Sequence, residues 1–138
     1  MKKALIVFGG WPGHEPEKCN EILSKFLNSE GYEVRSENST EAFAEDYVHE
    51  MDLIIPIVTM AFHHSPKGEI KKNEVNNLIK AVVNGCGLAG HHGGMCDAFR
   101  QSIDWQFLTG GQWVSHPNGI HDYNCLLYTS DAADDGVG

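Results

Sequence analysis

The chain has 138 residues, which suits a single domain, and its 41% hydrophobic content is ordinary for a soluble globular protein. A formal net charge of −9 argues against a nucleic-acid or anionic-membrane partner, and no apolar run approaches the roughly 18 residues of a membrane helix. Four cysteines without CxxC spacing favour a reducing cytoplasm over a disulfide framework.

The first part of the chain alternates between strand and helix patterns. The continuous apolar run 3–8 is typical of a parallel strand that is buried on both faces. Residues 15–30 then predict a helix, and residues 32–37 alternate as an exposed or edge strand does. The helix would present one apolar stripe, formed by Cys19, Ile22, Leu23, Phe26 and Leu27.

The middle of the chain continues the alternation. Residues 40–47 predict a short helix capped by Thr40. Residues 53–58 predict a third strand, buried on both faces. Pro56 lacks a backbone donor, so we expect it near the end of this strand or at an irregularity.

The remaining elements complete an α/β order. Residues 70–84 predict a helix with Val75, Leu78, Ile79 and Val82 on one face, residues 86–92 a fourth strand, and the stretch from Gly93 to about Ile103 another helix. Regular alternation of strand and helix, with right-handed crossovers, predicts a three-layer, doubly wound parallel sheet of the flavodoxin-like type.

The C-terminal segment fits neither period. The stretch 125-CLLYTSDAADDGVG-138 resembles the translated sequencing-adapter tails of metagenomic gene fragments. We therefore expect a domain over 1–124 that is truncated at its C-terminus, followed by a non-native or disordered tail over 125–138; a natural acidic disordered tail is the alternative. A truncated sheet would expose a strand edge, which predicts self-association.

Histidines concentrate where this fold places its ligands. Open α/β sheets bind ligands at the carboxyl ends of their strands, which selects the loops 9–16, 59–69 and 90–95. Five of the eight histidines fall in these loops: His14, His63, His64, His91 and His92. This clustering predicts a His-rich pocket.

The loop 90-GHHGG-94 has the form G-x-H-x-G at a strand-to-helix turn. It matches the nucleophile elbow G-x-S-x-G of hydrolases, with His92 at the nucleophile position. A neutral imidazole there can act as general base, polarise a carbonyl or bind a metal. The alternative is that His92 only fixes the turn. His91 should face the opposite way in the strand and play a structural part, and Cys96 lies about one helical turn too late to be the nucleophile.

These stretches resemble the ThuA-like (trehalose utilisation) family, whose fold is related to class I glutamine amidotransferases. The matching segments are the buried strand entering 9-GGWPGHEP-16, the elbow 87-GLAGHHGG-94 and the run 104-DWQFLTGGQWVSHP-117. The resemblance covers roughly residues 3–123. It implies a link to sugar utilisation, whereas glutaminase chemistry is not expected, because the elbow cysteine of the amidotransferases is replaced by His92.

By match to those motifs, the resemblance implies one pocket. His92 and His116 are the candidate catalytic residues, and the candidate substrate-binding residues are Trp11, His14, Trp113 and Asp97. Asp97 would orient a histidine, and the two tryptophans would stack on a sugar face.

Two functions remain open at this stage. The first is an enzyme that transforms a sugar or sugar-derived carbonyl compound, with His92 as base or electrophile and His116 as its partner; clustered imidazoles would also suit zinc or iron, although no fixed ligand spacing is present. The alternative is a non-catalytic sugar-binding module on an amidotransferase-like scaffold. A catalytic site should bring two histidines, or a histidine and a carboxylate, within hydrogen-bond reach.

Overall fold

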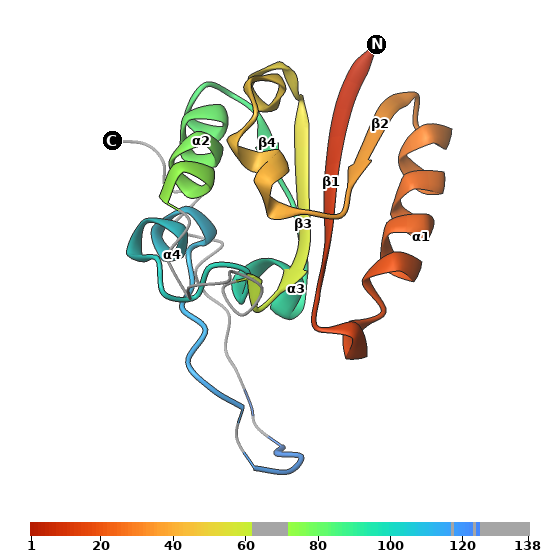
Figure 1. The fold of residues 1–138 in the computed structure, drawn as a ribbon. Coiled ribbons are helices and arrows are strands. Elements are labelled where there is room, and N and C mark those ends of the chain that lie inside the picture. Colours follow the sequence, from red (N-terminus) through yellow and green to blue (C-terminus); the bar gives the residue numbers. More distant parts are fainter. Residues whose placement is uncertain (62–71, 117, 123, 125–138) are drawn as a thin grey trace.

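The computed structural model describes residues 1–61, 72–116, 118–122 and 124. Its centre is a parallel four-stranded sheet (Figure 1) in the order β2-β1-β3-β4, formed by β1 (Lys2–Gly10), β2 (Tyr32–Glu37), β3 (Leu53–Thr59) and β4 (Gly87–Leu88). The chain passes from β1 to β2 on one side and then to β3 on the other, so the sheet is doubly wound and flavodoxin-like, as predicted. The expected tail over 125–138 lies outside the described residues.

The apolar run of β1 is continuous because both faces of the strand are covered. Leu5 and Val7 point into one core cluster, and Ala4 and Ile6 point into the other. All four side chains are fully buried, and each large apolar side chain removed from water contributes about 1.5–3 kcal/mol to folding. The alternation of residues between two cores therefore fixes the three-layer architecture.

Helix α1 (Pro16–Ser29) covers one face of the sheet. Cys19, Leu23 and Leu27 pack there against the strands. The predicted five-residue stripe was too wide, because Ile22 and Phe26 are 67% and 57% exposed. Only one side chain per helical turn therefore contacts the sheet.

The second face is covered by α2 (Lys72–Val83), α4 (Ile103–Thr109) and two short 3-10 helices, η2 (Thr40–Ala44) and η3 (Asp46–Glu50) (Figure 1). The predicted helix over 40–47 is thus two 3-10 turns. Its cap is Ser39, whose hydroxyl accepts a hydrogen bond from the Glu41 amide, and not Thr40, which is buried. No helix in the described ranges is long and apolar enough to cross a membrane.

Pro56 lies in the middle of β3, paired in register with Val7, and not near the end of the strand. The carbonyl of Ile54 accepts from the Ala89 amide on the β4 side, and backbone groups alternate sides along a strand. The missing donor of Pro56 therefore faces the β4 side beyond Leu88, where β4 has already ended. The irregularity that accommodates Pro56 is therefore the early end of the neighbouring strand, β4.

The expected strand over 86–92 and the helix that follows it were drawn too long. Strand β4 ends at Leu88, α3 begins at His92 and ends at Cys96, and α4 is a separate helix. The buried Trp105 joins the two helices, because its indole Nε1 donates to the Met95 carbonyl at 3.0 Å and its ring packs against Phe99.

Candidate functional site

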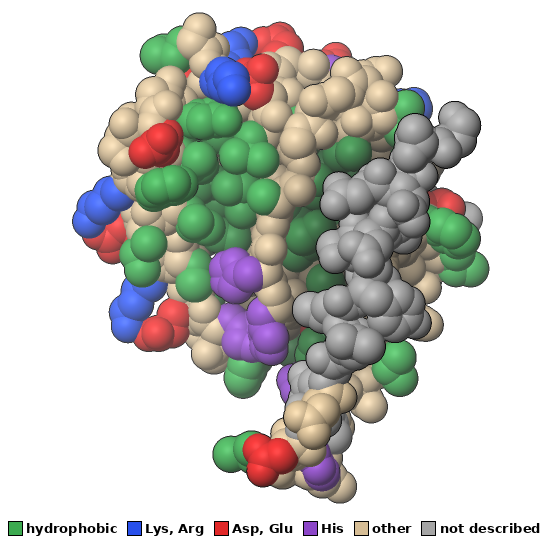
Figure 2. Space-filling view, turned by 180° about the vertical axis from the view of Figure 1, so that it is seen from behind, with side chains coloured by type: hydrophobic (Ala, Val, Ile, Leu, Met, Phe, Trp, Pro, Cys, Tyr) green, Lys and Arg blue, Asp and Glu red, His purple; other side chains and the backbone are tan. Residues whose placement is uncertain are grey.

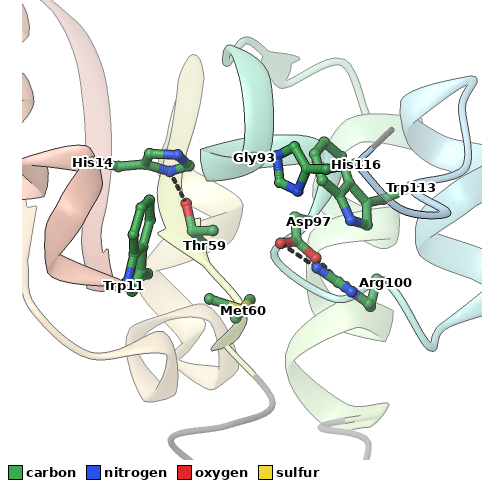
Figure 3. A pocket seen from close by; sticks show the side chains of 9 residues that line it. All are labelled: Trp11, His14, Thr59, Met60, Gly93, Asp97, Arg100, Trp113 and His116. Carbon is green, nitrogen blue, oxygen red and sulfur yellow. Dashed lines mark hydrogen bonds and ion pairs between the residues drawn. The ribbon is translucent and has the colours of Figure 1, made fainter. Parts of the chain in front are cut away.

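A pocket of about 340 Å³ opens at the carboxyl ends of the strands, where β1 and β3 lead in opposite directions. This is the switch point at which doubly wound sheets bind ligands. Figure 3 shows Trp11 and His14 on one side of the pocket and Trp113 and His116 on the other. Among the described residues, the lining consists of Trp11, His14, Thr59, Met60, Gly93, Asp97, Arg100, Trp113 and His116.

The turn after β1 places His14. A Cβ atom on Gly10 would lie 2.1 Å from the Thr59 carbonyl oxygen, so only glycine lets the two chains approach here. The Trp11 amide then donates to that carbonyl at 3.1 Å, and the 3-10 turn η1 (Pro12–His14) directs the imidazole back over the end of β3. Nδ1 of His14 lies 2.7 Å from the Thr59 hydroxyl oxygen.

The surroundings of His14 favour its neutral form. Burial lowers the pKa of His14 below its ordinary value, and the imidazoles of His92, His116 and His91 lower it further, whereas the Asp97 carboxylate raises it. At neutral pH this imidazole therefore carries one proton, and its Nε2 is left for a ligand because Nδ1 is engaged by Thr59.

The elbow has the tight geometry that its glycines predict. His92, at the nucleophile position, has φ = +50°, a left-handed conformation that is uncommon for a side chain with a Cβ. A Cβ atom on Gly93 would lie 3.2 Å from His14 Cε1, and one on Gly94 would lie 3.2 Å from the Cα atom of Ile57. The two glycines thus let α3 lie directly against β3 and His14.

His92 is close to His14 but does not line the main pocket. Its ring centroid is 4.9 Å from that of His14 and 6.0 Å from that of Trp113. It lines a second hollow of about 230 Å³, together with His14, Ile57, His91 and Gly94. The expectation that His91 faces away from His92 was wrong, because β4 ends three residues earlier and strand alternation no longer applies.

The far wall of the pocket comes from the segment after α4. The ring centroids of Trp113 and His116 are 4.7 Å apart, and the guanidinium of Arg100 lies 5.6 Å from the centre of the Trp113 ring. Arg100 in turn binds both carboxylate oxygens of Asp97 (Figure 3). Asp97 is 2% exposed and orients an arginine, whereas we expected it to orient a histidine.

Trp11 forms the rim of the near wall. Its side chain is 47% exposed, and its ring centroid lies 4.8 Å from that of His14. The indole folds over Gly13, where a Cβ atom would lie 2.4 Å from the indole Cζ2 atom. Trp11 is therefore held at the mouth of the pocket with much of its surface in water.

The structure adds pocket residues that the sequence did not single out. Thr59 is the last residue of β3 and holds His14; its position at the carboxyl end of a predicted strand was the available indication. Met60 and Arg100 carry no comparable pattern.

Three non-glycine residues in the described ranges have positive φ. Glu15 lies after β1, Met60 after β3 and His92 after β4.

The sequence left open whether the clustered imidazoles hold zinc or iron. No three His, Cys, Asp or Glu side chains in the described part of the chain are grouped so that they could hold a metal ion. His63 and His64, two of the five histidines in the loops expected to bind ligands, lie outside the described residues.

The family model of ThuA, described as trehalose utilisation, matches residues 3–135. No curated protein and no solved structure shows a significant match to the chain. The segments that carried the resemblance lie together around the pocket: the turn after β1, the elbow at α3 and the segment after α4. Because the family match covers almost the whole chain, the protein belongs to the ThuA trehalose-utilisation family.

Proposed function

We propose that the protein binds a sugar or a sugar-derived metabolite in the pocket between Trp11 and Trp113. The observation that carries this proposal is the position of His14, which is held by Thr59 between an exposed tryptophan and the elbow. Membership of the trehalose-utilisation family supports a ligand related to sugars.

The lining suits the two kinds of surface that a sugar presents. Aromatic rings bind the apolar C–H face of a sugar, and a few placed polar groups bind its hydroxyls. Trp11 and Trp113 stand on opposite walls, and His14 and His116 stand beside them (Figure 3). The volume of about 340 Å³ lies within the range of small-molecule pockets.

For a reaction, we propose that His92 acts as base or electrophile and that His116 is its partner. Both rings pack against Trp113, His92 at 6.0 Å and His116 at 4.7 Å between centroids. A ligand that lies on the Trp113 ring and extends from the main pocket into the second hollow would therefore meet both imidazoles. Neutral imidazole can take a proton at physiological pH.

A non-catalytic sugar-binding module is the second candidate, and one observation favours it. In the described residues no hydrogen bond joins two pocket histidines or a pocket histidine to a carboxylate; His14 is bonded to a hydroxyl and Asp97 to Arg100. Catalytic hydrogen bonds often form only with the substrate bound, so the two candidates are separated by kinetics. His116→Gln should keep the ligand affinity and abolish turnover in an enzyme, whereas a binding module has no turnover to lose.

We also propose that the protein is not a glutaminase. The elbow presents His92, and the nearest cysteine, Cys96, ends α3 four residues later and does not line either hollow. Thiolate attack on glutamine needs a cysteine at the elbow. Release of ammonia from glutamine by the purified protein would contradict this.

We further propose a reducing cytoplasm as the compartment, no nucleic-acid partner, and self-association. Cys19, Cys86 and Cys96, the cysteines in the described ranges, are free thiols, which supports the proposal of a reducing cytoplasm as the site of action. The net charge of −9 supports the absence of a nucleic-acid partner. Self-association through an exposed strand edge is tested by sedimentation.

Calorimetric titration with trehalose, glucose and their oxidised derivatives tests the binding proposal. Trp11→Ala and Trp113→Ala should each weaken the binding of the recognised sugar by about fivefold, since the loss of one stacking contact is worth on the order of 1 kcal/mol. Phe107→Ala is the matched control, because Phe107 is an aromatic residue that is 85% exposed and does not line the pocket. Equal losses in all three variants would contradict the proposal.

A further inference from the structure

The second hollow has an unusual lining. Its polar side chains are three histidines, His14, His91 and His92, and its remaining residues are Ile57 and Gly94. His91 and His92 are exposed, and no hydrogen bond within the described residues engages either of their rings. Two exposed imidazoles thus line the same hollow with their donor capacity unused.

In the part of the chain that the structure describes, no carboxylate contributes to this lining. The nearby acidic groups are engaged elsewhere: Asp97 by Arg100, and Glu15 by Lys18. Figure 2 shows histidine side chains gathered beside a hydrophobic area, while most acidic side chains in this view lie toward its edges. Although the chain has a net charge of −9, this hollow is therefore a place where a negatively charged group can bind.

We infer that the hollow lined by His14, His91 and His92 binds an oxyanion, the phosphate or carboxylate group of a small molecule. A neutral imidazole offers one N–H donor and an imidazolium offers two, whereas a cation finds no carboxylate in the lining. Hydrogen bonds from charged donors to an anion are about twice as strong as neutral ones.

The hollow shares His14 with the main pocket, because that imidazole lines both. Resting on the proposed function, the inference narrows the metabolite to an acidic sugar derivative, with its ring against Trp11 or Trp113 and its anionic group against His91 and His92. The anion site itself does not depend on sugar binding, so the two are tested separately.

The first test uses inorganic sulfate on the whole chain, followed through the histidine Cε1–H resonances at constant ionic strength. Sulfate keeps its charge across the pH range used, so the pH dependence reports on the protein. We expect saturable shifts of His91 and His92 at pH 6, and affinity at least tenfold weaker at pH 8, because histidine is the side chain that changes charge between these values. Asp97, Arg100, His116, Glu15 and Lys18 are the other charged or titratable groups near His14.

Substitution assigns the site. The double variant His91→Gln/His92→Gln should weaken sulfate binding at pH 6 by about a hundredfold, since each of the two lost charged hydrogen bonds is worth roughly one factor of ten. His49→Gln is the control, because His49 is bonded to Asn77 outside the hollow. Unsaturable shifts, or equal affinity in the double variant and the wild type, would overturn the inference.

The source of the anion is resolved by three ligands of similar size: glucose 6-phosphate, gluconate and glucose. Tighter binding of one acidic compound, lost in the double variant, identifies phosphate or carboxylate as the group recognised. Sulfate binding without any sugar binding would overturn the proposed function and leave the anion site standing. Equal binding of glucose and of both acidic compounds would overturn the narrowing to an acidic sugar derivative and leave sugar binding standing.

Discussion

The Nδ1 atom of His14 and the Oγ1 atom of Thr59 lie 2.7 Å apart, and this contact joins the carboxyl ends of the two central strands. Thr59 is 4% exposed and belongs to the rigid end of β3, whereas His14 lies in the turn after β1. The strand thus fixes both the orientation of the imidazole and the nitrogen that remains for a ligand. Such support on a rigid element is what a preorganised site requires.

Thr59→Val should release His14 while the shape of the residue is kept. The backbone bond from the Trp11 amide to the Thr59 carbonyl is unaffected, so the expected loss of stability is only about 1 kcal/mol. We expect ligand affinity to fall by about tenfold, measured by calorimetry. Thr59→Ser keeps the hydroxyl and should restore binding; similar affinity of the valine and serine variants would show that the contact is irrelevant.

The pKa of His14 offers a second test. Burial lowers it first and the His92 imidazole second. His92→Gln should therefore raise the pKa of His14, though not to the ordinary value of about 6.5, because the burial remains. The titration of the His14 Cε1–H resonance measures this directly. An unchanged midpoint would mean that His92 does not act electrostatically on His14.

The lowered pKa of His14 also makes the stability of the fold depend on pH. The unfolded chain binds a proton at this residue near pH 6.5, while the folded chain binds it only at lower pH. The contribution of His14 is therefore fully present above pH 6.5 and is lost as the pH falls toward the folded-state pKa. In urea unfolding at pH 7.5 and pH 5.5, wild type should lose more stability on acidification than His14→Gln does.

Asp97→Asn should loosen the far wall of the pocket. The buried carboxylate binds the Arg100 guanidinium through two oxygens, and that guanidinium lies over Trp113. Hydrogen bonds to charged groups are worth about 1.5–3 kcal/mol, so we expect a loss of about 2 kcal/mol in urea unfolding. Glu50→Gln removes the exposed ion pair with Lys3 and should cost much less stability, because water screens exposed charges. Equal losses would refute a special role for the Asp97–Arg100 pair.

Much of the fold could be predicted because burial on two faces leaves a plain mark in the sequence. The runs of β1 and β3 were recognised for that reason, and the edge strand β2 was recognised by its alternation. The segment 86–92 was misjudged, because apolar content does not reveal that a strand pairs at only two residues before the chain turns. Ile22 and Phe26 were misjudged because helical spacing does not reveal how wide a stripe the sheet can cover.

The candidate site was predicted in part for a related reason. Trp11, His14, Trp113 and His116 were identified by their loops and motifs, and the fold brings them to one pocket. Thr59 and Arg100 were missed because their roles arise from tertiary geometry: the register of β3 against β1, and the path of the chain after α3. The partner of Asp97 could not be inferred from spacing alone. Arg100, three residues later in the chain, can bind the Asp97 carboxylate just as any pocket histidine could.

The two glycines of the elbow should differ in what they control. A Cβ atom on Gly94 would lie 3.2 Å from backbone at Ile57, which cannot yield without moving β3. A Cβ atom on Gly93 would lie 3.2 Å from the edge of the His14 ring, which can shift by a few tenths of an ångström. Gly94→Ala should therefore cost about 1–3 kcal/mol of stability. Gly93→Ala should cost less stability than Gly94→Ala, because its added Cβ would meet side-chain atoms, His14 Cε1 at 3.2 Å and Thr59 Cγ2 at 3.3 Å, and because alanine also favours the helix. It should nevertheless displace the His14 resonance and weaken ligand binding. Urea unfolding and histidine NMR on both variants check this. Gly85→Ala is the control for backbone strain without crowding, because Gly85 has a positive φ and its added Cβ would meet no atom within 4 Å.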